Sequence, residues 1–231
     1  MRRIIMKDLQ VWLTYHDKSQ IEEYGLIETD IIRLFRGNDT QVSGKNINGL
    51  NKFYSEICTL YYVWKNNLRS STVGFCHYRR KFQNVLELEK GQCQVLDIKK
   101  NSPIFPHYKL AHNFQDLYDV IEILENKYGK TNKYSQYLMT GNVFVPFCSF
   151  IMWYNDFNHL CDWLFPILFA WDEKNKLGMN PEKYMKKAQA DFRYDNVDYQ
   201  CRAVAFLAER LVSCYIVTEM HPLCVSDLNT L

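Results

Sequence analysis

The clearest pattern in the chain is a stripe of apolar residues between positions 48 and 67. Apolar side chains recur there at helical intervals, at Leu50, Phe53, Tyr54, Ile57, Leu60, Tyr61 and Trp64. A helix with 3.6 residues per turn places side chains at this spacing on one face. We therefore predict one amphipathic helix over residues 48–67.

Short apolar runs predict β-strands on both sides of this helix. They cover residues 10–15, 30–35 and 72–76, with a weaker run near 94–98 and a buried one over 143–152. Helical spacing returns at 114–128, which Gly129 should end, at 156–172, where Pro166 should bend the helix, and at 197–217. Strands that alternate with helices, followed by a helix-rich second half, predict an α/β fold.

Composition narrows the classes of protein that fit this pattern. Of the 231 residues, 47% are apolar and 15% aromatic, enough for a sizeable core in one compact unit. The formal net charge is only +2, which argues against a nucleic-acid binder, so any bound anion needs a local basic cluster. The eight cysteines include no C-x-x-C pair, which predicts buried, reduced thiols in a cytosolic protein.

We expect neither a signal peptide nor a membrane span. The first residues are basic, but Lys7 and Asp8 interrupt them before a long apolar region develops. No uncharged run approaches the roughly 18 residues that a membrane helix needs. These features predict a soluble, cytoplasmic protein.

Polar residues follow three of the predicted strands. His16 comes after the first strand, Asn38 after the second, and His77-Tyr78-Arg79-Arg80 directly after the third. If these strands are parallel neighbours, their carboxyl ends share the edge of the sheet at which α/β proteins bind ligands. Arginine suits bidentate recognition of phosphate, and a tyrosine ring can stack on a base. The alternative is a strand that ends in a solvated basic turn.

Two segments resemble a bacterial exopolysaccharide and capsule biosynthesis family. The sequence YSEICTLYYVWKN at 54–66 is similar to the family pattern Y-x-E-L-T-A-L-Y-W-x-W-K-N, and VGFCHYRRKF at 73–82 is similar to I-G-L-C-H-Y-R-R-Y-F. Further matches follow in the same order at 108–112, 150–152, 161–168 and 200–211. Two departures are Lys81, where the family has tyrosine, and Cys148, where it has asparagine. The family was long catalogued as a domain of unknown function and is regarded as glycosyltransferases with a GT-A-like fold.

The resemblance implies one GT-A-like domain over 1–231 with a Rossmann-type mixed sheet. Residues 1–100 would be the nucleotide-sugar-binding half and 101–231 the helix-rich acceptor side. The implied reaction moves a hexose, with galactofuranose and galactose as candidates, from a UDP-sugar to a lipid-linked glycan in capsule, exopolysaccharide or O-antigen synthesis. The alternative is a non-catalytic nucleotide- or glycan-binding partner in a polysaccharide-assembly complex. The aromatic segment 163–171 could touch the inner face of the membrane, or it could pack in the core.

Glycosyl transfer needs a partner for the leaving diphosphate. The chain contains no Asp-x-Asp, the usual GT-A metal motif, and Glu28-Thr29-Asp30 precedes a strand instead of ending one. We therefore predict no metal and no cofactor, with the diphosphate held by Arg79, Arg80 and His77. Glu56, off the apolar stripe of its helix, would accept a hydrogen bond from uracil or ribose, or pair with an arginine.

For a base that accepts the acceptor's proton, three candidates lie in the second half. They are Glu209, Asp198 and His112. Arg202 lies on the same helix face as Glu209, and we assign Arg202 and Cys148 to the acceptor side. The alternatives are an Asp198–Arg202 pair, a structural ion-pair network around Glu209, and a hydrogen-bonded structural histidine at 112.

Overall fold

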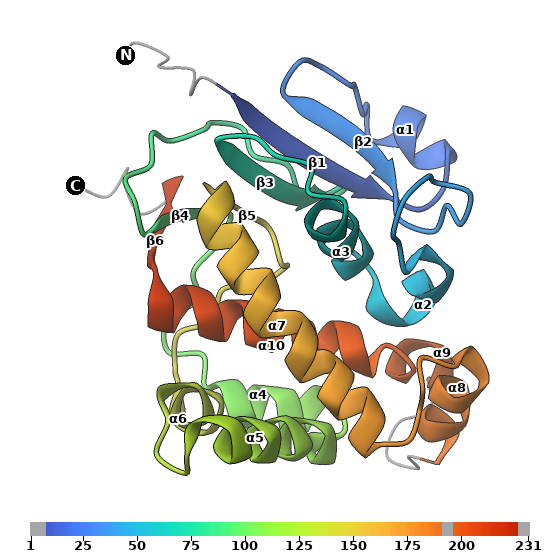
Figure 1. The fold of residues 1–231 in the computed structure, drawn as a ribbon, viewed down its shortest axis with the longest axis vertical. Helices are drawn as coiled ribbons and strands as arrows, with labels where there is room; N and C mark the ends of the chain where they lie inside the picture. Colours follow the sequence, from blue (N-terminus) through green and yellow to red (C-terminus); the bar gives the residue numbers. More distant parts are fainter. Residues whose placement is uncertain (1–7, 191–195, 226–231) are drawn as a thin grey trace.

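The computed structural model describes residues 8–190 and 196–225, which contain one six-stranded mixed sheet (Figure 1). The strands lie in the order β2-β1-β3-β5-β4-β6. Their bounds are β1 Leu9–Tyr15, β2 Ile32–Arg36, β3 Thr72–His77, β4 Gln92–Val95, β5 Phe150–Trp153 and β6 His221–Cys224. β5 runs antiparallel to its neighbours β3 and β4, and the other neighbouring pairs are parallel. The carboxyl ends of five strands and the start of β5 therefore meet at one edge.

Helices form a thick layer on one face of this sheet. In chain order they are α2 Asn51–Tyr54, α3 Ile57–Lys65, α4 Ile104–Ala111, α5 Phe114–Tyr128, α6 Lys133–Thr140, α7 Tyr154–Lys174, α8 Pro181–Gln189, α9 Val197–Gln200 and α10 Ala203–Glu219. The short helix α1, Ser19–Glu23, lies on the opposite face, where Ile21 packs against the smaller apolar cluster described below. α7 contacts β3 and β5, α10 contacts β6, and the two helices cross each other, while α4, α5 and α6 pack outside them (Figure 1).

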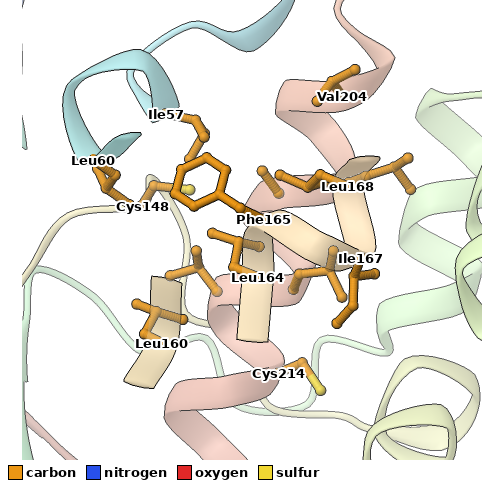
Figure 2. Close-up of a cluster of buried hydrophobic side chains, with 14 of the residues drawn as sticks. Ile57, Leu60, Cys148, Leu160, Leu164, Phe165, Ile167, Leu168, Val204 and Cys214 are labelled. Atoms are coloured by element: carbon orange, nitrogen blue, oxygen red, sulfur yellow. The ribbon is translucent and has the colours of Figure 1, made fainter. Parts of the chain in front are cut away.

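The main core lies where α7, α3 and α10 meet. α7 contributes buried side chains that face Ile57 and Leu60 of α3 and Val204 and Cys214 of α10 (Figure 2). These α7 residues are Leu160, Leu164, Phe165, Ile167 and Leu168. Full burial of one such side chain stabilises a fold by about 1.5–3 kcal/mol. This packing fixes the helical layer against the sheet.

A smaller apolar cluster covers the other face of the sheet. Leu13, Cys76 and Ile151 belong to it, together with Leu88 from the segment that follows β3. The Gln94 side chain ties this segment to the sheet, since its Nε2 donates to the Asn84 carbonyl at 2.7 Å and its Oε1 accepts from the Leu86 N–H at 2.9 Å. The basic turn after β3 is therefore held on both sides. It begins at a strand of the sheet, and the segment that follows it packs against the same sheet.

The predicted fold class is confirmed. The sheet is mixed, the second half of the chain is helix-rich, and the strands expected at 10–15, 30–35 and 72–76 are β1, β2 and β3. The helix at 114–128 is α5, and Gly129 follows it with a φ of 91° that favours glycine. All eight cysteines are buried, and no two described cysteines form a disulfide.

Two expected helices are each broken in two. Ser55, with φ 53°, separates α2 from α3, and Cys201 and Arg202 separate α9 from α10. The breaks meet in space, because Arg202 Nη2 donates a hydrogen bond to Ser55 Oγ at 3.0 Å. The apolar spacing predicts which side chains are buried, but a tertiary contact decides where the backbone leaves the helix.

The strand expected at 143–152 is also shorter than predicted. Only its last residues pair in the sheet, as β5, because Phe147 and Cys148 adopt positive φ angles of 78° and 48°. The sequence did not predict α1, α4, α6, α8 and β6. α6 and α8 carry a readable signal, since Asn132 and Asn180 cap their first N–H groups.

Helix α7 is not a membrane surface. Trp163, Phe165 and Trp171 are buried in the core, and the helix continues through Pro166. Among the residues that the structure describes, no helix is long and apolar enough to cross a bilayer. The core-packing alternative for segment 163–171 is therefore the one observed.

Candidate active site

Two adjoining clefts open near the edge at which the parallel strands end. The larger, of about 420 Å³, is lined by five basic side chains, Arg79, Arg80, Lys99, Arg202 and Arg210. Two carboxylates, Glu56 and Glu209, and three histidines, His77, His107 and His112, also line it. The smaller, of about 220 Å³, shares His77, Arg79 and Arg202 with the larger and adds His16, Asn51, Lys52, Ser55 and Tyr78. The excess of basic groups favours an anionic ligand.

The turn after β3 projects two arginines into this region. The Tyr78 N–H donates to the Thr14 carbonyl at 3.0 Å, and the Arg80 N–H donates back to the His77 carbonyl at 2.8 Å. The Arg80 guanidinium carbon lies 3.8 Å from the centre of the Phe147 ring. No carboxylate in residues 8–190 or 196–225 forms an ion pair with Arg79 or Arg80. Both arginines are exposed, so their charges are hydrated and remain available to an anionic ligand.

His77 and His16 lie side by side at the ends of β3 and β1. Their ring centres are 5.6 Å apart. Burial, followed by His16 and the neighbouring arginines, lowers the pKa of His77 to about 3. Burial and then Arg202 and Arg79 also lower the pKa of His16. Both rings are therefore neutral at neutral pH, so His77 can offer hydrogen bonds to a diphosphate but no positive charge.

Glu209 is tied into the wall of the larger cleft. Its Oε1 accepts a hydrogen bond from the Phe147 N–H at 2.8 Å, and its Oε2 pairs with Arg210. The Arg210 side chain is only 3% exposed, and its Nη2 also lies 3.2 Å from His107 Nδ1. Glu209 thus holds the backbone of Phe147, where the chain adopts a positive φ. This is the structural ion-pair network that the sequence left open.

Glu56 follows Ser55, the residue at which the predicted helix breaks into α2 and α3. The residue is partly buried at the start of α3, directly after the serine that receives the Arg202 hydrogen bond. Burial raises the pKa of Glu56; Glu209 raises it further, while the Ser55 hydroxyl and Arg202 oppose the rise. Its carboxyl group therefore titrates closer to neutrality than a solvated glutamate does.

Three predicted site residues do not line either cleft. Asn38 is exposed after β2, and Cys148 is buried in the main core. Asp198 pairs with Lys52 at 2.8 Å rather than with Arg202, and its side chain is 79% exposed. A solvated carboxylate outside the clefts is badly placed to take a proton from a bound acceptor.

His112 lines the larger cleft but is a weak base. Its ring stacks on Phe206 with centres 3.8 Å apart. Burial, followed by the charge of Arg210, lowers the pKa of His112 to about 3. A group with this pKa binds a proton poorly at neutral pH, so His112 fits a structural or positioning role better.

No cluster of three or more His, Cys, Asp or Glu side chains is arranged to hold a metal ion within the described parts of the chain. The expectation of a metal-independent reaction stays a prediction.

A family described as "Domain of unknown function (DUF4422)" matches residues 32–106 and 94–220. The chain belongs to this family. Both the turn after β3 and the Glu209–Arg210 pair lie within the matched segments of DUF4422.

A solved structure has the same fold. It is titled "WbbM bifunctional glycosytransferase apo structure", with a TM-score of 0.67 and 18% sequence identity. The match covers 94% of this chain and 44% of that one, so this chain spans less than half the length of WbbM. The search of curated proteins found no match. At this identity the likeness concerns the fold.

Sequence reasoning missed several residues of this DUF4422 site. Arg210, Lys99, His107 and Phe147 all line the larger cleft. One signal was present, because Glu209 and Arg210 are two consecutive charges in the middle of helix α10, which is largely apolar up to Glu219 at its end. Adjacent charges in a buried helix need partners, and a functional site is one place where such partners are found.

Proposed function

We propose that this protein is a GT-A-type glycosyltransferase that moves a sugar from a nucleoside diphosphate sugar to an acceptor. The observation that carries the proposal is the set of three arginines, Arg79, Arg80 and Arg202, beside the ends of parallel strands. None of them has an ion-pair partner in the described structure. The likeness to the fold of a glycosyltransferase supports the same activity.

The two clefts suit the two halves of such a donor. Tyr78, His16 and Asn51 line the smaller cleft and offer rings and an amide to a base and ribose. Arg79 and Arg202 line both clefts, so a diphosphate between them would leave the sugar in the larger cleft. A diphosphate gains negative charge as it leaves, and each charge-assisted hydrogen bond to it contributes about 1.5–3 kcal/mol.

We further propose the identity of the substrates. The donor is a UDP-sugar that carries a hexose, with galactofuranose and galactose as the candidates, and the acceptor is a lipid-linked glycan. The product belongs to capsule, exopolysaccharide or O-antigen synthesis, and the reaction needs no metal. The protein would then work in the cytoplasm, in peripheral contact with the inner face of the membrane. Because the chain spans less than half of a bifunctional enzyme, we propose one transfer reaction for it.

Calorimetric titration tests the donor site. UDP, UDP-galactose and GDP are added to the protein in EDTA and then with manganese. We expect UDP to bind in EDTA, and Arg79→Ala to weaken it about 10- to 100-fold through loss of charge-assisted hydrogen bonds. The control Arg33→Ala removes an exposed arginine that pairs with Glu28 at 3.4 Å, away from both clefts, and should leave binding unchanged.

Three results would change this picture. Strict dependence on manganese would contradict the metal-independent site, and failure to bind any nucleotide would overturn the donor site. Release of UDP from UDP-galactose, UDP-galactofuranose or UDP-glucose separates an enzyme from a binding protein. UDP binding without UDP release from any of these donors would support the non-catalytic partner.

A further inference from the structure

We infer that Glu56 is the base that takes the proton from the acceptor hydroxyl, and that Glu209 is a positioning residue that holds the wall of the cleft. This inference rests on the proposed transferase function. It assigns different roles to the two carboxylates that line the larger cleft.

Both carboxylate oxygens of Glu209 already have partners within the protein. One of its oxygens accepts the Phe147 N–H and the other pairs with Arg210. Arg210 is buried, and a proton on Glu209 would remove the counter-charge of that guanidinium. Protonation would also weaken the hold on Phe147, whose ring lies against Arg80. Each turnover through Glu209 would thus disturb the site that must bind the donor.

Glu56 has no ion pair of this kind, and its neighbour is the Ser55 hydroxyl, which opposes the rise in pKa that burial causes. No lysine or arginine of the described chain forms an ion pair with its carboxylate. Its backbone is nevertheless fixed, because Arg202 donates to Ser55 Oγ at 3.0 Å and Asn51 Nδ2 donates to the Ser55 carbonyl at 3.0 Å. A carboxylate on a fixed backbone, without a cation to neutralise it, is placed to accept a proton from a ligand.

The surroundings of Glu56 also suit a base. Burial and the nearby charge of Glu209 raise its pKa, which strengthens it as a proton acceptor. Arg202 opposes this rise in pKa, which favours the ionised form of the carboxyl group. Arg202 also lines both clefts, so a diphosphate bound there would lie near the same guanidinium.

The reaction then balances without another reagent. The acceptor oxygen forms a bond to C1 of the sugar as the bond from C1 to the diphosphate oxygen breaks. The electron pair of the broken bond leaves with the diphosphate, whose charge Arg79 and Arg202 meet. The acceptor proton moves to a Glu56 oxygen and from there to solvent. A single displacement of this kind inverts the configuration at C1.

The test uses the full chain and measures UDP release from UDP-galactose and UDP-galactofuranose between pH 5 and 9, with water as acceptor. We expect Glu56→Gln to lower kcat at least 100-fold, as loss of a general base does. The affinity for UDP should stay within about 3-fold, since Glu56 lines the larger cleft, proposed for the sugar, and not the smaller cleft proposed for the base and ribose. In the wild type the rate should rise with pH as Glu56 loses its proton, and this acid limb should be absent from the residual activity of Glu56→Gln.

Three further variants make the result specific. Glu56→Asp keeps a carboxylate and should show an intermediate rate with the acid limb retained. Glu209→Gln should lower the melting temperature but keep the acid limb. Glu87→Gln removes an exposed carboxylate outside both clefts and should behave as the wild type.

The failures can be told apart. If Glu56→Gln keeps more than a tenth of the wild-type kcat, or if Glu209→Gln removes the acid limb, the inference is wrong and the transferase stands. A glycosyl adduct on Glu56 in the mass spectrum would also overturn its role as a base. If the wild type binds UDP but releases none from UDP-galactose, UDP-galactofuranose or UDP-glucose, the proposed function itself fails, and this inference fails with it.

Discussion

The Glu209–Arg210 ion pair has two unequal members, and this inequality can be measured. The Arg210 side chain is 3% exposed, whereas the Glu209 side chain is 23% exposed. Either substitution removes the same pair, but each leaves a different group behind. Glu209→Ala leaves a buried guanidinium without its counter-charge, whereas Arg210→Met leaves a carboxylate that reaches solvent and can be hydrated.

The expected costs follow from these surroundings. Removal of one partner from a buried ion pair costs about 3–5 kcal/mol. Arg210 keeps weaker acceptors, His107 Nδ1 at 3.2 Å and the Phe206 carbonyl at 3.5 Å, which favours the low end of that range. Loss of the acceptor for the Phe147 N–H adds about 1 kcal/mol. We therefore expect Glu209→Ala to lower the free energy of unfolding by about 3–4 kcal/mol.

Arg210→Met should cost less, about 1–2 kcal/mol, because Met refills the apolar space and Glu209 stays hydrated. For a chain of this size, each kcal/mol shifts the melting temperature by about 2–4 °C. Calorimetry should thus show a drop of roughly 6–16 °C for Glu209→Ala and roughly 2–8 °C for Arg210→Met. The double variant should be more stable than Glu209→Ala alone, because it no longer buries an unpaired charge.

Equal losses in the two single variants would refute this reasoning. So would a double variant that is no more stable than Glu209→Ala. Either result would mean that the buried charge of Arg210 does not dominate the energetics of the pair. Urea unfolding of the same proteins checks that the order does not depend on temperature.

Further outcomes follow from single positions. The pKa of His77 is lowered from 6.5 to about 3, so its contribution to stability is present above pH 6.5 and is lost as the pH falls. Melting experiments at pH 7 and pH 5 should show that the free energy of unfolding drops by about 1–2 kcal/mol between them. The drop should be smaller in His77→Asn. Gly74→Ala should cost about 1–3 kcal/mol in urea unfolding, because the new Cβ would lie 2.8 Å from Ile151 Cγ1. Asp198→Ala should change stability by less than about 1 kcal/mol, since its pair with Lys52 is exposed, and a larger loss would indicate a role that the surface position does not suggest.

Local pattern was enough to predict much of this protein. The periods of apolar residues predict α5, α7 and the first three strands, because burial of alternate or helically spaced side chains is a local property of the sequence. Of the polar groups at the strand ends, His16 and His77 lie side by side, whereas Asn38 after β2 lines neither cleft. β1 and β3 are parallel neighbours, with Thr14 opposite His77, so the residues that follow each strand share one edge.

The tertiary structure decided how the chain departs from those local patterns and which charges meet. Ser55 and Arg202 are far apart in sequence, yet their contact joins the breaks between α2 and α3 and between α9 and α10. The spacing of residues along the chain could not decide between Glu209 and Asp198 as the base. That choice depends on their partners in the folded chain, which are Arg210 and Phe147 for Glu209 and Lys52 for Asp198. Apolar periodicity records which side chains avoid water. Hydrogen bonds and ion pairs depend on atoms within a few ångströms of each other, and only the folded chain brings those atoms together.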